Sequence, residues 1–252
     1  EVVLEGSGIS ALARRRMGGR DLVLAYHGVV EDGAVHADAS AHLAVSSFAA
    51  QMEAIAELAE VVPVGALSAP PRRRDRPRVA ITFDDGYLDN HAFAAPELSR
   101  RGMTATFFVA SSFIDSDHQA WWDSDCGIRS RWMTWDHVRD LHAAGFSIGA
   151  HTRTHADLGV CGFDTAVAEI EGSVDDIAAA LGARPTLFAY PFGGVDNMTS
   201  AVRDWVRGSG LRCCPSSYGG LVGPQTDPFD LPRLPITTWY RSPYQMGVEA
   251  LR

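Results

Sequence analysis

The sequence predicts an α/β fold in which parallel strands alternate with helices and form a closed or distorted barrel. Short apolar segments alternate with segments whose apolar residues recur at helical spacing, giving roughly seven β/α units. Side chains able to carry chemistry directly follow several of the apolar segments, at His27, Asp84 and His151. The carboxyl ends of parallel barrel strands meet at one rim, which is where barrel active sites lie.

The first half of the chain supplies four of the expected strands. β-Branched and aromatic runs predict strands at 22–26, 61–64, 79–83 and 104–109. A first helix has the apolar stripe Phe48, Met52, Ile55 and Leu58. We expect Ser46 or Ser47 to cap that helix, and a second helix near 91–101 to end at Gly102.

The second half continues the alternation after a Trp-rich, irregular stretch at 111–133. Thr134 is a typical cap for a helix that ends at Gly145. Further strands are expected at 146–150, 186–189, 211–214 and 231–236, and further helices at 163–181, at 197–207 and from Pro243 onward. No linker or composition break divides the chain, so we expect a single domain over 1–252, with 1–20 as an extension.

Composition excludes several classes of function. The 252 residues carry a net charge of −9, which argues against a general nucleic-acid-binding protein. All 22 basic residues are Arg, so chemistry that needs a Lys nucleophile or a phosphate-loop Lys is excluded. No apolar run approaches the ~18 residues of a membrane span. No signal peptide is visible either, which favours a cytoplasmic protein unless a segment before Glu1 has been removed.

Two motifs predict a mononuclear metal site. Asp84 and Asp85 follow a buried strand and precede Gly86, and His151 and His155 follow another buried strand. Histidines four residues apart lie one above the other on a helix, and we expect this pair to bind one ion in that way. Two histidines and one carboxylate leave a coordination position open, as in catalytic zinc sites. The same set suits Fe(II), so an iron oxygenase stays open, although the second carboxylate favours hydrolysis.

These residues resemble the motifs of a known family. Thr82-Phe83-Asp84-Asp85-Gly86 and His151-Thr-x-x-His155 resemble the first two motifs of the polysaccharide deacetylases, the NodB-homology family of carbohydrate esterases (family 4). Tyr190-Pro191-Phe192-Gly193 is similar to the third motif, and the resemblance runs from about 22 to 236. It implies a distorted (β/α)7 barrel of the NodB-homology type and metal-dependent removal of N-acetyl groups from a sugar.

The resemblance also implies roles for individual residues. Asp84 would be the general base, and Asp85, His151 and His155 would bind one divalent ion, with zinc the first choice. The family places an Arg at the position of Ala189 and a late histidine as general acid, but this chain has no histidine after His155.

Two other residues are candidates for the missing roles. Ala25-Tyr26-His27-Gly28-Val29 resembles the Tyr-His-x-Val segment of a subgroup that includes biofilm-polysaccharide deacetylases. In that subgroup the order of the motifs is circularly shifted. We therefore expect His27 to be the general acid and Arg233 to replace the missing Arg. A relative that binds glycans without catalysis would also explain the departures.

An N-acetylated glycan is the expected partner. Trp121, Trp122, Trp132 and Tyr190 are candidate surfaces for sugar stacking, with Trp121 or Trp122 lining the cleft. The backbone N–H of Phe192 is the candidate donor to the reaction's oxyanion. A small non-sugar amide or cyclic imide remains an alternative substrate, which a closed pocket would favour and an open groove would not.

Overall fold

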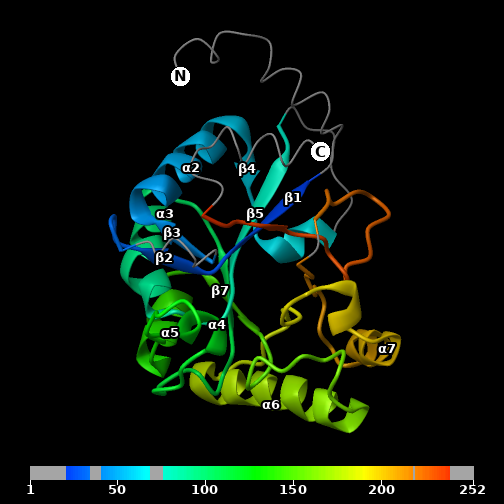
Figure 1. Ribbon diagram of the computed structural model, residues 1–252. Helices are drawn as coiled ribbons and strands as arrows, with labels where there is room; N and C mark the ends of the chain where they lie inside the picture. The colour runs from blue at the N-terminus through cyan, green and yellow to red at the C-terminus, as the bar shows by residue number, and fades with distance from the viewer. Residues whose placement is uncertain (1–20, 35–40, 69–75, 218, 239–252) are drawn as a thin grey trace.

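The computed structural model describes residues 21–34, 41–68, 76–217 and 219–238, and a parallel sheet lies at its centre (Figure 1). The sheet has the order β7-β6-β5-β1-β8, and β4 also pairs with β5. Its strands are β1 (Leu22–Tyr26), β4 (Glu60–Val61), β5 (Arg78–Phe83), β6 (Thr106–Val109), β7 (Ser147–Ala150) and β8 (Leu234–Pro235). A separate parallel pair consists of β2 (Gly28–Val30) and β3 (His42–Ala44).

Helices surround this sheet in Figure 1. The α-helices are α2 (Val45–Leu58), α3 (Ala95–Arg100), α4 (Trp121–Ser124), α5 (Trp135–Ala143), α6 (Phe163–Leu181) and α7 (Ser200–Gly208). A π-helical turn, Asn90–Ala94, leads into α3, and 3-10 turns occupy Val64–Ser68 and Val195–Asn197. Within the described residues, no helix is long and apolar enough to cross a bilayer.

Parallel pairing continues beyond β7 through isolated bridges. Ala150 pairs with Phe188, Leu187 with Cys213, and Pro215 with Leu231, which lies just before β8. β8 in turn pairs with β1. The α/β class is confirmed, whereas full barrel closure stays a prediction because single bridges stand where continuous strands were expected.

An aromatic stack aligns the ends of the central strands. Tyr26 of β1 lies opposite Phe83 of β5, which lies opposite Phe107 of β6. The rings of Tyr26 and Phe83 stack at 5.4 Å, and those of Phe83 and Phe107 at 4.8 Å. Because the strands are parallel and in this register, His27 and Asp84 leave the sheet side by side.

Several element predictions are confirmed and some are wrong. The strand at 22–26 and the helix at 163–181 match β1 and α6, and Thr134 caps α5 by accepting the N–H of His137. The first helix begins earlier than expected, with Ala44 and not a serine at its cap, and Leu58 is 44% exposed. The expected extension at 1–20 and the helix from Pro243 lie outside the described residues.

Candidate metal centre and catalytic site

The end of β5 points two adjacent carboxylates in different directions. The N–H of Asp84 continues the sheet by donating to the Tyr26 carbonyl at 2.9 Å. Asp85 and Gly86 then adopt left-handed backbone, with φ of 74° and 96°. A left-handed residue is uncommon outside glycine, and here it turns the chain sharply so that both carboxylates remain buried at the rim but with separate partners.

Asp84 is held by Arg233. The guanidinium donates from Nη1 to Oδ1 at 2.8 Å and from Nη2 to Oδ2 at 2.6 Å, a bidentate pair in which Arg233 is 0% exposed. Nη1 also donates to the hydroxyl of Thr82 at 3.1 Å. Burial acts to raise the pKa of Asp84, but the charges of Arg233 and His151 outweigh it and hold the pKa below its ordinary value. Asp84 is therefore ionised at neutral pH.

Asp85 lies between the two histidines. Its Oδ1 is 3.4 Å from Nε2 of His151 and 3.4 Å from Nε2 of His155. Burial would raise the pKa of Asp85, but the adjacent imidazoles of His151 and His155 keep it well below the ordinary value. The pKa of His155 falls to about 4, chiefly through burial, which leaves a neutral imidazole of the kind that binds metals.

This triad fits a divalent ion. One ligand atom from each of Asp85, His151 and His155 lies within 4.8 Å of the others. The Nδ1 of His151 is 2.8 Å from the carbonyl of Ala189 and so carries the proton, leaving the Nε2 lone pair toward Asp85. Asp85 Oδ1 is buried and has no hydrogen-bond partner. A buried acceptor without a donor, facing two imidazole nitrogens, is what a cation between them would satisfy.

The expected helix for the two histidines is wrong. Residues 151–155 form a loop after β7, and Thr152 and His155 have φ of 61° and 56°. The left-handed Thr152 reverses the chain so that both imidazoles face Asp85, which a helical turn was expected to achieve by spacing alone. A β-branched residue in this region is a true outlier and indicates a backbone held by its surroundings.

His27 follows β1 at the same rim. Its backbone carbonyl accepts from Nδ2 of Asn90 at 2.6 Å, and its buried Nδ1 has no hydrogen-bond partner. A proton on His27 would lower the pKa values of Asp84, Asp85 and His155, so the ring lies within electrostatic reach of all three. The role of general acid stays a prediction.

Aromatic rings form a wall beside His155. The Trp122 ring lies 4.8 Å from the His155 ring, and the ring of Phe192, a residue that is 42% exposed, lies 4.6 Å from it. Trp121 is 61% exposed and stands edge-on to Trp122 at 5.7 Å. Of the two tryptophans proposed for the cleft, Trp122 contacts the site and Trp121 extends the apolar surface away from it.

Two other aromatic expectations fail. Tyr190 is 0% exposed, and its hydroxyl donates to the Phe229 carbonyl at 3.1 Å, so its ring has no free face for a sugar. Trp132 is buried beside Tyr87 and donates to the His118 carbonyl. Both are core residues, because their polar tips find partners inside the protein.

The structure adds residues that no sequence motif indicated. The indole N–H of Trp122 donates to the Tyr87 hydroxyl at 2.8 Å, which donates to the buried Asp123 at 3.0 Å. Asp123 also accepts from Ser130 at 2.7 Å and lies 3.3 Å from Nε2 of His42. This network fixes the orientation of Trp122. Its members are far apart in sequence, so only the fold reveals it.

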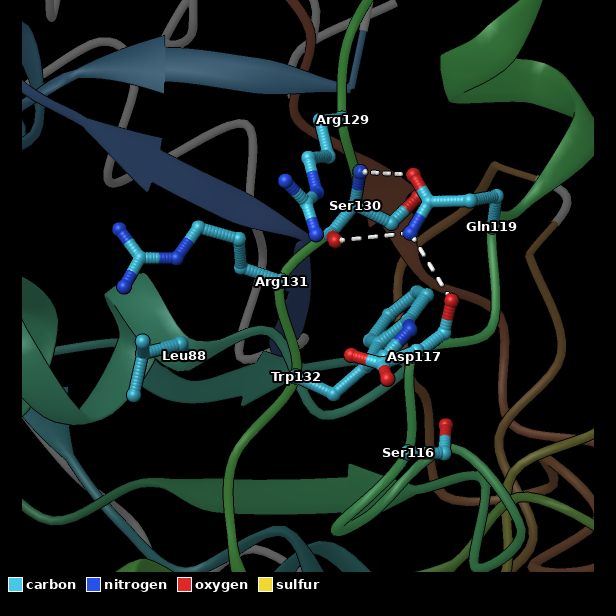
Figure 2. Close-up of a pocket in the computed structure, with 8 residues that line it drawn as sticks. All are labelled: Leu88, Ser116, Asp117, Gln119, Arg129, Ser130, Arg131 and Trp132. Carbon is cyan, nitrogen blue, oxygen red and sulfur yellow. Dashed lines mark hydrogen bonds between the residues drawn. The ribbon is translucent and has the colours of Figure 1, made fainter.

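A separate hollow of about 500 Å³ is lined mainly by residues between Ser116 and Trp132 (Figure 2). Its lining includes Arg129, Arg131 and Trp132 but none of the triad residues. In Figure 2 the Gln119 amide makes two hydrogen bonds to the Ser130 backbone, accepting its N–H at 3.1 Å and donating to its carbonyl at 3.4 Å. These two hydrogen bonds join the ends of the segment that contains α4 and Trp122. We assign the hollow no part in the chemistry.

The fold and the triad together define an α/β protein with a candidate mononuclear metal centre at its strand ends. The family model described as polysaccharide deacetylase matches residues 72–209, and the chain belongs to this family. A curated relative, YxkH of Bacillus subtilis (strain 168), bears the name of a polysaccharide deacetylase and is 29% identical over 121 residues. That match covers 48% of this chain and 39% of YxkH, so the chain spans well under two thirds of its relative.

Solved structures show the same fold. The Streptococcus pyogenes deacetylase PplD, in complex with acetate, matches with a TM-score of 0.75 and 20% identity, over 91% of this chain and 97% of that one. IcaB from Ammonifex degensii matches with a TM-score of 0.72 and 20% identity, over 93% and 98%. At these identities the likeness establishes the fold and leaves the substrate to be argued from the site.

Proposed function

We propose that the protein is a metal-dependent hydrolase that removes N-acetyl groups from an aminosugar-containing polysaccharide or oligosaccharide. One observation carries the proposal: the adjacent carboxylates of Asp84 and Asp85 have different partners. Asp84 is bound through both oxygens to Arg233, whereas Asp85 faces His151 and His155. Membership of the polysaccharide deacetylase family supports the same reading.

Asp85, His151 and His155 would hold the divalent ion, and zinc is the first choice for two imidazoles and one carboxylate. When bound, the ion supplies Lewis-acid polarisation of the amide carbonyl and a lowered pKa for an attacking water. The neutral His155 and the fixed tautomer of His151 present their Nε2 atoms for this purpose. These ligands leave Asp84 free for proton transfer.

Asp84 would accept the proton of the attacking water. Arg233 keeps it ionised and fixes its orientation through two hydrogen bonds, so the carboxylate need not reorganise during the reaction. His27, on the neighbouring strand end, would donate a proton to the departing amine. An amide needs that proton because an amide anion is a very poor leaving group, and general acid or base assistance typically contributes about 10²–10⁴ in rate.

The backbone N–H of Phe192 would stabilise the oxyanion. The residue adopts left-handed backbone with φ of 59°, next to His155, and its N–H has no acceptor among the described residues. Trp122 and Phe192 would then flank the N-acetyl group, and the exposed Trp121 offers an outer face on which a further sugar ring could stack.

An acetate-release assay on neutral N-acetylglucosamine oligomers tests the proposal. The chelated protein is reloaded with zinc, cobalt or no metal, and released acetate is quantified. We expect release only with metal, and its loss in Asp84→Asn. Metal-independent release, or release that Asp84→Asn leaves unchanged, would contradict it. A parallel screen of small amides and cyclic imides detects the alternative substrate class.

A further inference from the structure

The loop that joins the two histidine ligands has an unusual backbone. Thr152 and His155 are both left-handed, yet the loop contains no glycine that would adopt this conformation freely. Such conformations persist only where neighbouring groups determine them. The polar contacts of this loop therefore show what holds the two imidazoles toward Asp85.

One side of the loop is fixed by the segment that follows β6. The N–H groups of Ser111 and Ser112 donate to the carbonyls of Thr152 and Arg153, at 3.2 and 2.9 Å. Within the loop, the Thr152 hydroxyl accepts the N–H of Ala156 at 3.1 Å. The first two bonds anchor the carbonyl groups of Thr152 and Arg153. The N–H groups of Arg153 and Thr154 need acceptors from another part of the protein.

Glu169 of α6 satisfies both of those N–H groups. Its Oε2 accepts from the backbone of Arg153 at 2.9 Å and from the backbone of Thr154 at 2.9 Å. Its Oε1 accepts the Thr154 hydroxyl at 3.0 Å. A single carboxylate thus binds three donors from the two residues midway between the histidine ligands. Hydrogen bonds to a charged acceptor are stronger than neutral ones, so this contact restrains the loop strongly.

The Arg153 side chain makes a second connection to the same helix face. It crosses Gly172, where an added Cβ would lie 2.6 Å from its Nε, and donates to both oxygens of Asp176 at 2.9 and 2.8 Å. Asp176 also accepts the Ser111 hydroxyl at 2.7 Å. Glu169, Gly172 and Asp176 recur at helical spacing and face the loop together.

We propose that Glu169 is a positioning residue for the metal centre: it holds the left-handed loop that orients His151 and His155, and Asp176 supports it through Arg153. The inference rests on the proposed function, since it assumes that these histidines bind metal. Glu169 touches neither histidine side chain in the described contacts, so it acts through the Arg153–Thr154 backbone.

The test compares zinc affinity in Glu169→Ala, Glu169→Gln and the control Glu171→Ala. Glu171 is exposed on the same helix, so its removal changes the net charge equally without touching the loop. Dissociation constants are measured by competition with a chromophoric chelator, and chemical denaturation of the metal-free proteins verifies folding. We expect Glu169→Ala to weaken zinc binding at least tenfold, in line with residues that orient metal ligands. Glu169→Gln should lie between it and wild type, and the control within twofold of wild type.

Hydrogen exchange supplies a readout that a merely structural role would not give. In metal-free Glu169→Ala, amides of 152–155 should exchange faster while those of β5 and β7 stay protected. Equal zinc affinity in folded Glu169→Ala and Glu171→Ala would overturn the positioning role. If Glu169→Ala does not fold, the same comparison on Glu169→Gln decides. Wild-type protein that binds no zinc would instead contradict the proposed function.

Discussion

Replacing Arg233 with Met removes the guanidinium that holds both oxygens of Asp84. Both side chains are buried, so the variant leaves a carboxylate inside the protein with two unfilled hydrogen-bond positions. Removing one member of a buried pair typically destabilises a protein by about 3–5 kcal/mol. For a chain of this size, a loss of about 2–4 °C per kcal/mol then predicts a drop in Tm of roughly 6–20 °C.

The effect should depend on pH. In the wild type the pKa of Asp84 lies below its ordinary value, so Asp84 contributes stability at neutral pH that is lost as pH falls through the folded pKa. Without Arg233, burial becomes the dominant influence and raises the folded pKa above the unfolded one. The variant then loses stability as pH rises, so its deficit should be larger at about pH 8 than at about pH 5.

Urea denaturation in excess chelator measures this deficit without contributions from bound metal. The double variant Asp84→Asn/Arg233→Met is the control, because it removes the buried charge as well and should recover much of the loss. A single variant within about 1 kcal/mol of wild type, or a double variant no more stable than the single one, would refute the reasoning. Zinc affinity of Arg233→Met should change little, since Arg233 contacts none of the triad.

Three further predictions concern the site. Alanine at either ligand histidine should remove most bound metal, measured by elemental analysis. Asp84→Asn should retain its metal but lose about 10²–10⁴ in rate. Metal loss in Asp84→Asn would instead reverse the roles of Asp84 and Asp85. His27→Ala should reduce turnover of an N-acetylated oligosaccharide far more than that of an aryl acetate ester, whose leaving group needs no proton, and equal losses would exclude a general acid. Tyr87→Phe removes one of the donors to Asp123 and the acceptor of the Trp122 indole N–H, so we expect a loss of about 1–3 kcal/mol together with a raised KM. Tyr190→Phe, which removes a hydroxyl that donates to the Phe229 carbonyl in the core, should leave KM unchanged.

The sequence predicted those parts of the fold in which local pattern and packing agree. β5 reads as a continuous buried strand because both of its faces are covered, and every one of its residues is buried. α6 shows a regular apolar stripe and ends at the left-handed Gly182, so its bounds followed from local signals. Strands at 186–189 and 211–214 were expected on the same grounds, but in the structure they pair only through single bridges, which depend on the register of their neighbours.

The parts of the site made by residues adjacent in the sequence could be predicted. The parts that depend on contacts between residues distant in the sequence could not. Asp84 and Asp85 are recognisable because they follow one strand, but the left-handed loop at Thr152 has no sequence signal, and the spacing of the histidines suggested a helix instead. Tyr190 lies in a motif-like segment, yet whether it faces a cleft or the core depends on Phe229, which accepts its hydroxyl. Tertiary contacts decide such cases.

The pairing of Asp84 with Arg233 joins two segments that are far apart in the sequence. β1 lies between β5 and β8 in the sheet, and His27 and Asp84 follow the ends of β1 and β5, whereas Arg233 directly precedes β8, one residue before the Leu234–Leu24 pair. The long Arg233 side chain therefore reaches the Asp84 carboxylate from within the sheet, where its guanidinium is fully buried. Arg233 bonds both oxygens of Asp84 although it is distant from Asp84 in the sequence, and its replacement of an Arg at the position of Ala189 stays a prediction.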